Sequence, residues 1–236
     1  MTIRRITTSF FLAAALSIPS ISALAQPKPG HLDEVLRQMD AASVKFKSAE
    51  ADFQWDLFER VVNQTTSQKG TIYFEKDGVK TEMGAKIVSP ALKLLEYRDG
   101  TLRVFDPGPD HLTTILARKN QAQMESFLTL GFGGSGKDLA RAWTVSDLGT
   151  ESMSDGAHQV ETAKLDLVSK DPGVRNSITH VTVWVDAERG ISLKQVFYMP
   201  SEDRRTAVYT NIRDNQKVDR KPYEIKTDSR TTRDEH

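Results

Sequence analysis

The spacing of hydrophobic residues changes early in the chain from the period of a helix to the period of a strand. From His31 to Lys47 apolar residues recur every three or four positions, on one face of an amphipathic helix: Leu32, Val35, Leu36, Met39, Ala42 and Phe46. From Ala51 apolar residues alternate with polar ones, and one face carries Ala51, Phe53, Trp55 and Leu57. The change predicts a helix that lies on a sheet.

Alternating segments continue through most of the chain and are separated by turn signals. We expect a polar loop at 63–70 that leads into a strand at 71–76, and three Asp-Gly pairs supply the positive φ angles of tight hairpins. The further strands that we expect are Val79–Val88, Leu92–Arg98, Thr101–Phe105, His111–Ile115, Trp143–Met153, Gln159–Ser169, Ile178–Asp186, Ile191–Met199, Thr206–Ile212 and Tyr223–Lys226. About eleven strands with such turns predict a mainly β (α+β) domain with one dominant curved antiparallel sheet.

The segment "GFGGSGKDL" at 131–139 comes close to a phosphate-binding loop. Gly131, Gly136 and Lys137 have the required spacing, but Asp138 occupies the place of the hydroxyl residue that holds magnesium. The residues before it have a helical pattern, whereas a phosphate-binding loop follows a buried parallel strand. We therefore expect no nucleotide.

A hinge explains the same glycines better. Helical patterns flank them at Met124–Leu130 and Lys137–Trp143, and glycine bends a chain freely because it has no Cβ atom. We interpret the segment as the hinge of a helical lid, with these hinge residues: Gly131, Gly133, Gly134 and Gly136.

Other arrangements that carry chemistry are incomplete. The chain has no cysteine, its five histidines lack metal-site spacing, and Lys137 replaces the last glycine of a nucleophile elbow around Ser135. Carboxylates alternate along one strand face as on a solvated surface: Glu50, Asp52, Asp56 and Glu59. We expect no catalytic residue, metal or cofactor. An enzyme acting on a surface glycan or lipid, with carboxylates from different strands, stays open as an alternative.

Both ends of the chain have distinctive compositions. Two arginines, an apolar stretch from Phe10 to Ile18 and small residues before position 26 predict a signal peptide at 1–25. The remaining domain at 26–226 would then lie outside the cytoplasm. The chain without the signal peptide has a net charge of about −2, which offers no field for nucleic acid. The tail at 227–236 has no apolar residue to bury, and we expect it to be disordered.

The order of these elements resembles the LolA-like outer-membrane lipoprotein carriers. The shared features begin with the amphipathic helix, the strand "AEADFQWDLFER" and the strand "GTIYF". They continue through the hairpin "LLEYRDGTLRVFDP", the glycine segment and the paired strands of "ITHVTVWVDAERGISLKQVFYMPSEDRRTAVYTNI". The resemblance covers about His31 to Lys226, and it rests on the ordered set of features.

The resemblance implies an incomplete, strongly curved antiparallel β-barrel whose concave side is closed by helices over an apolar cavity. It implies a monomeric periplasmic carrier of lipoprotein acyl chains, served by an inner-membrane exporter and an outer-membrane acceptor, with no enzymatic activity. The cavity residues that we expect are Phe53, Trp55, Ile72, Phe74, Phe105, Val183, Val185 and Phe197 on the sheet, and Phe127, Leu128 and Phe132 on the lid. Tyr73 and Trp184 have the opposite parity and should face outward.

One departure from the family concerns the latch of the lid. Carriers of this family have a basic-Arg-Pro stretch after the "[YF]-[FV]" strand, and its Arg closes the lid; here the stretch is Glu75, Lys76 and Asp77. Lys76 offers a charge without the planar fork of Arg, and it is the candidate latch. Two other functions stay open: a carrier of other lipids or glycolipids that serves a lipid exporter, and a non-carrying envelope adaptor domain.

Overall fold

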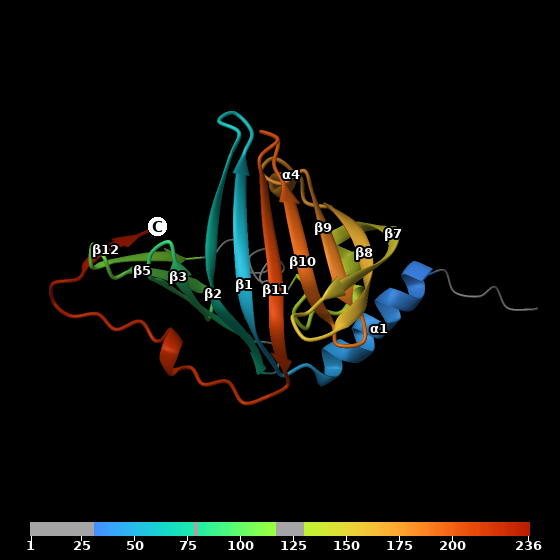
Figure 1. The fold of residues 1–236 in the computed structure, drawn as a ribbon, viewed down its shortest axis with the longest axis horizontal. Coiled ribbons are helices and arrows are strands. Elements are labelled where there is room, and N and C mark those ends of the chain that lie inside the picture. Colours follow the sequence, from blue (N-terminus) through green and yellow to red (C-terminus); the bar gives the residue numbers. More distant parts are fainter. Residues whose placement is uncertain (1–30, 78–79, 117–129) are drawn as a thin grey trace, which may run out of the picture.

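The computed structural model describes residues 31–77, 80–116 and 130–236, which form a curved β-sheet with a few short helices (Figure 1). The helices are α1 (His31–Lys45), α3 (Gly136–Ala142), α4 (Pro172–Arg175) and the 3-10 helix η1 (Lys221–Tyr223). The strands are β1 (Ser48–Glu59), β2 (Gln64–Asp77), β3 (Lys80–Ser89), β4 (Lys93–Arg98), β5 (Thr101–Asp106), β6 (His111–Leu116), β7 (Trp143–Ser154), β8 (Gln159–Ser169), β9 (His180–Asp186), β10 (Ile191–Tyr198), β11 (Arg204–Asp214) and β12 (Thr232–Glu235). None of the helices in the described ranges is long and apolar enough to cross a membrane.

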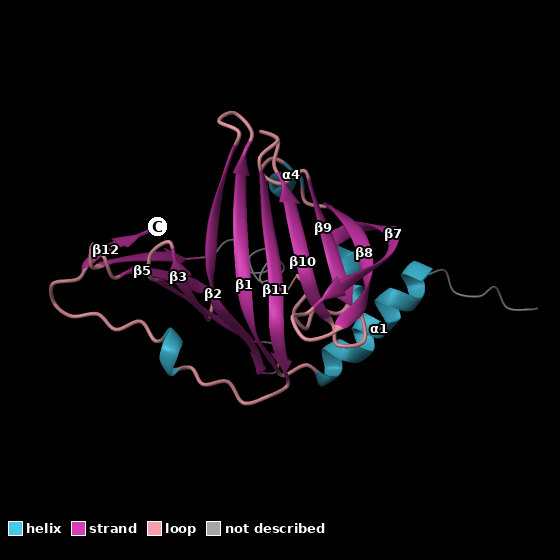
Figure 2. Cartoon of the chain, in the orientation of Figure 1, coloured by secondary structure: helices cyan, strands magenta, loops and turns pink. Residues whose placement is uncertain are grey.

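The twelve strands belong to one sheet in the order β12-β6-β5-β4-β3-β2-β1-β11-β10-β9-β8-β7. Neighbours are antiparallel, apart from the parallel pair of β12 and β6. Figure 2 shows β3 and β5 turned well away from the direction of β1, β11 and β10. Within the described residues the edge strands β7 and β12 do not pair with each other, so the predicted incomplete antiparallel barrel is confirmed.

Residues that lie directly opposite each other on neighbouring strands share a face of the sheet. Trp55 pairs with Ala207, Ala207 with Gln195, and Gln195 with Val183, so one face continues across four strands. We call it the inner face, because α1 and α3 pack on it, and the opposite one the outer face.

The inner face is covered in two different ways. Over β7 to β10 the apolar residues of α1 and α3, including Val35, Met39 and Leu139, pack with Leu165 and Val183 into one core cluster. Over β1 to β5 a second cluster contains Phe53, Ile72, Phe74, Met83 and Tyr97, and it meets Phe132 from the loop before α3. The helices therefore fill one half of the curved sheet, and a loop covers part of the other.

Several local predictions need correction. The stretch at 63–70 is not a loop, because β2 already begins at Gln64 and pairs with β1 up to Glu59. The strand expected at Tyr223–Lys226 does not form: η1 ends at Tyr223, and 224–226 belong to no helix or strand. The tail at 227–236 is not disordered: Thr232–Glu235 pairs with β6 through backbone hydrogen bonds, which need no apolar side chain. The lid helix expected at Met124–Leu130 lies, except for its last residue, outside the described residues.

The residues from 215 to 236, here called the C-terminal strap, cross the outer face of β2 to β4 before joining β6. Tyr223 packs edge-on against Tyr73, with ring centres 4.9 Å apart, and its hydroxyl donates to Glu50 at 2.7 Å. Burial raises the pKa of both tyrosines. Tyr73 does face outward as expected, but the strap leaves only 4% of it exposed.

Trp184 also lies on the outer face and is covered there by polar side chains. The Nζ atoms of Lys164 and Lys194 lie 4.9 and 4.4 Å from the ring centre, and the indole N–H donates to Glu151 at 2.9 Å. Glu151 has a lowered pKa, first because of this hydrogen bond and then because of the one from Lys164. Only 5% of Trp184 is exposed, so it offers no aromatic surface to a partner.

Candidate binding pocket on the inner face

The half of the inner face that the helices leave open contains a pocket of about 530 Å³. Its lining comes from β1, β2, β3, β4, β5, β10, β11 and the loop before α3: Trp55, Asp56, Leu57, Thr66, Gln68, Ile72, Phe74, Met83, Leu95, Leu102, Phe132, Gln195, Phe197, Arg205, Thr206, Ala207 and Tyr209. Most of these side chains are apolar, and the volume falls within the usual range for small-molecule sites.

The register of the strands brings these residues together. Phe74 lies opposite Met83, and Met83 opposite Tyr97, which in turn pairs with Leu102. On the other side of β1, Leu57 lies opposite Arg205, and Arg205 opposite Phe197. The apolar floor therefore spans strands that are far apart in the sequence.

Phe132 forms part of the pocket wall away from the sheet. Its ring stacks on Phe74 with centres 4.1 Å apart and an interplanar angle of 15°, and it meets Tyr209 edge-on at 4.8 Å. Phe53 stacks on Trp55 at 4.1 Å on the same face of β1. Burial raises the pKa of Tyr209 to about 12, although a hydrogen bond with the Trp55 side chain acts in the opposite direction. Tyr209 is therefore neutral at physiological pH.

The loop that carries Phe132 is fastened to the start of β10. Ser192 N–H donates to the Gly131 carbonyl at 2.5 Å, and Gly133 N–H donates to the Gly190 carbonyl at 3.1 Å. The side-chain amide of Gln195 donates to the Leu130 carbonyl. Three hydrogen bonds thus fix the backbone on both sides of the aromatic ring.

The glycines of this loop are required by space. Gly131 and Gly133 have φ values of +86° and +72°, and an added Cβ atom would lie 2.1 Å from the Ser192 Cβ and 2.2 Å from the Phe46 ring. At Gly136 the Cβ atom would lie 2.2 Å from the Leu36 carbonyl oxygen in α1. The interpretation as a freely bending hinge did not anticipate these contacts, and lid movement stays a prediction.

The lysine of the near-match to a phosphate-binding loop lies on the surface of α3. Ser135 caps this helix by accepting from the Asp138 N–H at 3.0 Å, and its hydroxyl donates to the Asp138 carboxylate at 2.7 Å. The Lys137 side chain is exposed, and its backbone N–H donates to Asp40. Asp138 therefore serves a helix cap in the place of a phosphate-binding hydroxyl.

Apart from Phe105, the predicted cavity residues separate into three groups. Those that line the pocket are Trp55, Ile72, Phe74, Phe132 and Phe197. Three others are buried on the same face outside the pocket. Phe53 lies beside it, and Val183 and Val185 lie beneath the helices. Phe127 and Leu128 lie outside the described residues, and Gly134 is half-buried in the loop.

The prediction for Phe105 is wrong, and the register of two hairpins explains why. Phe105 lies opposite Leu94 and Leu112, whereas the pocket residue Leu95 lies opposite Val104. Neighbouring residues of a strand point to opposite faces, so Phe105 is on the outer face. It is buried there, with 8% of its surface exposed.

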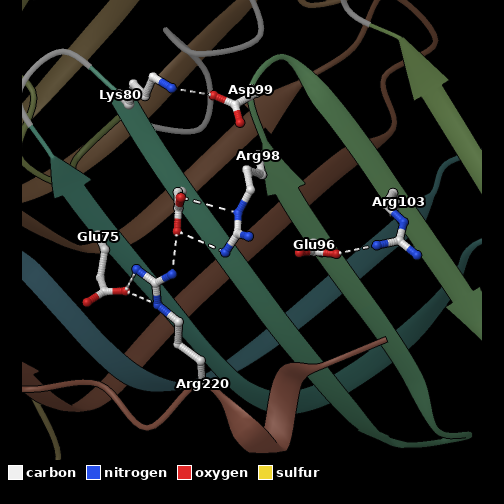
Figure 3. Close-up of polar contacts among 8 residues, drawn as sticks. Glu75, Lys80, Glu96, Arg98, Asp99, Arg103 and Arg220 are labelled. Carbon is white, nitrogen blue, oxygen red and sulfur yellow. Dashed lines mark hydrogen bonds and ion pairs between the residues drawn. The ribbon is translucent and has the colours of Figure 1, made fainter. Parts of the chain in front are cut away.

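Glu75, the first residue of the stretch 75–77, is bound on the outer face. Arg220 of the C-terminal strap bridges Glu75 and Glu82, at 2.5 and 2.8 Å, and Arg98 holds Glu82 from the other side at 3.2 Å (Figure 3). The pKa of Arg220 is raised by these carboxylates, although partial burial acts to lower it. Lys76 lies on the inner-face side of β2 and makes no side-chain ion pair or hydrogen bond with the described residues. Its role as a latch stays a prediction.

Sequence reasoning missed several pocket residues: Met83, Leu95, Leu102, Gln195, Arg205 and Tyr209. Tyr209 shares its parity with Ala207 in the pattern of β11, so the alternation of that strand was an available signal. Three of the four carboxylates noted on β1 are on the outer face, where Glu50 accepts from Tyr223 and Asp56 accepts from Ser67 at 2.7 Å. The fourth, Glu59, has the opposite parity and lies on the inner face, so the four do not share one face as expected. No group of three or more His, Cys, Asp or Glu residues that suits a metal ion occurs in the described residues.

No protein-family model and no curated protein matches the sequence. Solved structures do: the MucA/MucB complex of Pseudomonas aeruginosa matches at 12% identity with a TM-score of 0.50, over 84% of this chain and 62% of that one. An uncharacterized conserved protein from Thermus thermophilus matches at 8% identity and a TM-score of 0.51, over 86% and 98% of the two chains. A LolA superfamily protein from Nitrosomonas europaea matches at 13% identity and a TM-score of 0.40, over 84% and 99%. The chain thus spans less than two thirds of the MucB chain, and LolA-like proteins are among the structures that its fold resembles.

Proposed function

We propose that this protein is a carrier that shelters the acyl chains of lipoproteins or other lipids in the inner-face pocket and catalyses no reaction. The observation that carries the proposal is the apolar pocket of about 530 Å³, left open where α1 and α3 do not cover the sheet. Its walls are aromatic and aliphatic side chains of the core cluster over β1 to β5, closed on one side by Phe132.

The physics of acyl chains suits such a wall. Each CH₂ group moved out of water contributes about 0.8 kcal/mol, so a chain of about twelve carbons gains on the order of 10 kcal/mol before the cost of ordering it. Release then requires that part of this contact be undone. The stacked pair of Phe132 and Phe74 is the boundary whose separation would open the pocket further.

The location and the partners follow from the same proposal. The signal peptide predicted at 1–25 directs the chain to the periplasm, where an exported lipid must cross an aqueous space. An exporter in the inner membrane and an acceptor in the outer membrane would deliver and receive the cargo. Their contacts with the carrier would be transient.

Lipid extraction and native mass spectrometry of the protein purified from its own cell envelope test the proposal. Ala207→Phe fills the pocket, and Val208→Phe, on the outer face of the same strand, is the matched control. We expect acyl-bearing species on the wild type and on the control, and a loss of at least about tenfold on Ala207→Phe. A wild type without any acyl-bearing species, or equal loading of the two variants, would contradict the carrier.

A second candidate is an envelope adaptor that binds another protein. The similarity to a structure in which MucB is complexed with MucA favours it. If the protein is an adaptor, the pocket has no role, and Ala207→Phe expressed in a deletion strain would restore the wild-type phenotype. The carrier predicts that only Val208→Phe complements.

A further inference from the structure

An unpaired guanidinium lies at the mouth of the apolar pocket. Arg205 lines the pocket on β11, opposite Leu57 of β1 on one side and Phe197 of β10 on the other. Its side chain is exposed, and among the described residues it makes no ion pair or hydrogen bond. Most arginines in the described ranges are paired with a carboxylate: Arg37, Arg60, Arg98, Arg103, Arg141, Arg189, Arg213, Arg220 and Arg230.

The neighbouring arginine, Arg204, packs on an aromatic ring of the outer face. Arg204 lies opposite Phe58 and places its guanidinium 4.4 Å from the centre of that ring. Because consecutive strand residues point to opposite faces, Arg204 belongs to the outer face and Arg205 to the pocket. Two adjacent arginines therefore differ in whether they can reach a ligand in the pocket.

No carboxylate of the pocket lining neutralises Arg205. Asp56 is the acidic residue of that lining, but its carboxylate accepts from Gln54 and Ser67, which belong to the outer face. Glu59 is the next inner-face residue of β1 after Leu57. It lies about 7 Å further along the strand and does not line the pocket. The mouth thus carries one positive charge above an apolar floor.

Polar groups that can accompany a charged ligand stand beside the arginine. Thr66 lies opposite Leu57, and Gln68 opposite Trp55, so both lie on the inner face near the mouth. The side-chain amide of Gln195 donates its hydrogen bond to the Leu130 carbonyl and is not counted among these groups. Arg205, Thr66 and Gln68 therefore lie in one part of the pocket, together with the aromatic side chains of Trp55 and Phe197.

We propose that the ligand of this pocket is an anionic amphiphile, with its acyl chain on the apolar floor and a carboxylate or phosphate held by Arg205. A guanidinium forms paired hydrogen bonds with either anion, and it keeps its charge at all physiological pH values. The inference rests on the carrier function proposed above and narrows it to ligands with a negatively charged head group.

Binding of four probes of equal chain length tests the inference: dodecanoate, dodecyl phosphate, dodecanol and dodecylammonium. Calorimetry gives Kd for the wild type, Arg205→Gln and Arg204→Gln below the critical micelle concentration. We expect the wild type to bind both anions at least about tenfold more tightly than the alcohol, and Arg205→Gln to lose this preference. Arg204→Gln should retain it, and dodecanol should bind all three proteins alike. The ratio of the two anion affinities distinguishes a fatty-acid head group from a phosphate.

The outcomes separate this inference from the carrier function. Equal binding of anions and alcohol, or equal losses in the two arginine variants, would overturn the role of Arg205 while leaving the carrier intact. Binding of none of the four probes would overturn both. Arg205→Lys should keep part of the anion preference, because the charge remains while the planar fork is lost.

Discussion

Adding one methyl group at Gly133 tests whether the loop of Phe132 is fixed by close packing. In Gly133→Ala the new Cβ atom would lie 2.2 Å from the Phe46 ring, and the backbone keeps its φ of +72°. Gly149→Ala is the matched control, because its φ is +88° and nothing lies within 4 Å of the added atom. The two substitutions therefore share the backbone cost and differ in the space available.

The structure sets the size of both effects. An alanine in the left-handed region costs about 1–2 kcal/mol, which is the whole effect expected at Gly149. At Gly133 the overlap with Phe46 adds about 1–3 kcal/mol of overpacking, so the total becomes about 2–5 kcal/mol. Since Phe46 belongs to the same core cluster as Phe132 and Phe74, the strain should also reach the pocket wall.

Urea unfolding of the wild type and both variants at 25 °C measures the difference. We expect equal m-values and a free energy of unfolding at least about 1 kcal/mol lower for Gly133→Ala than for Gly149→Ala. A difference below about 0.5 kcal/mol would refute the close-packed loop, because only the shared backbone cost would then be present.

Three further predictions concern residues outside the pocket. Asp155 accepts two backbone N–H groups and pairs with Arg189, and its pKa is lowered first by those hydrogen bonds. Asp155→Asn should therefore lower the free energy of unfolding by about 1–3 kcal/mol at pH 7. The Asp155 carboxylate stabilises the fold above its ordinary pKa of 3.8, and this stabilisation is lost as the pH falls through the lower pKa of the folded state. The difference in unfolding free energy between wild type and Asp155→Asn should therefore shrink below about pH 4. A difference that stays constant with pH would contradict this role. Tyr223→Phe removes the hydroxyl that donates to Glu50 and should cost about 1.5–3 kcal/mol in the same assay, whereas an unchanged midpoint would mean that the strap does not depend on this bond. Lys137→Ala should change the free energy of unfolding by less than about 0.5 kcal/mol and leave acyl-chain binding intact, because the side chain is exposed. A loss of binding would indicate that Lys137 holds an anion.

The alternation of apolar and polar residues was sufficient to predict the helix on the sheet and most of the strands. It placed Trp55 and Phe74 on the inner face, because parity within one strand needs no long-range information. Phe105 could have been assigned correctly as well. The two-residue turn at 99–100 pairs Arg98 with Thr101, which sets Phe105 opposite Leu94.

Other features depend on contacts between distant parts of the chain. Val183 is on the inner face, as its parity predicts, but it lies under α1 and α3 and not in the pocket. Its parity does not show which half of the sheet the helices cover. Tyr73 is buried only because the strap crosses it, roughly 150 residues later in the sequence. The tail pairs with β6 through backbone hydrogen bonds and through polar contacts of Thr232 and Asp234 with His111, and neither shows in the pattern of apolar residues.

Quenching of Trp55 fluorescence by a brominated acyl chain tests the central claim most directly. Bromine quenches an indole only on contact, and Trp55 lines the pocket, whereas Trp184 lies on the outer face and Trp143 in the helix-covered core. We predict that a dodecanoate with bromine atoms along its chain quenches the wild type in a saturable way and that Trp55→Phe abolishes the saturable part. Saturable quenching of equal size in Trp55→Phe would show that acyl chains bind elsewhere and would contradict the carrier pocket.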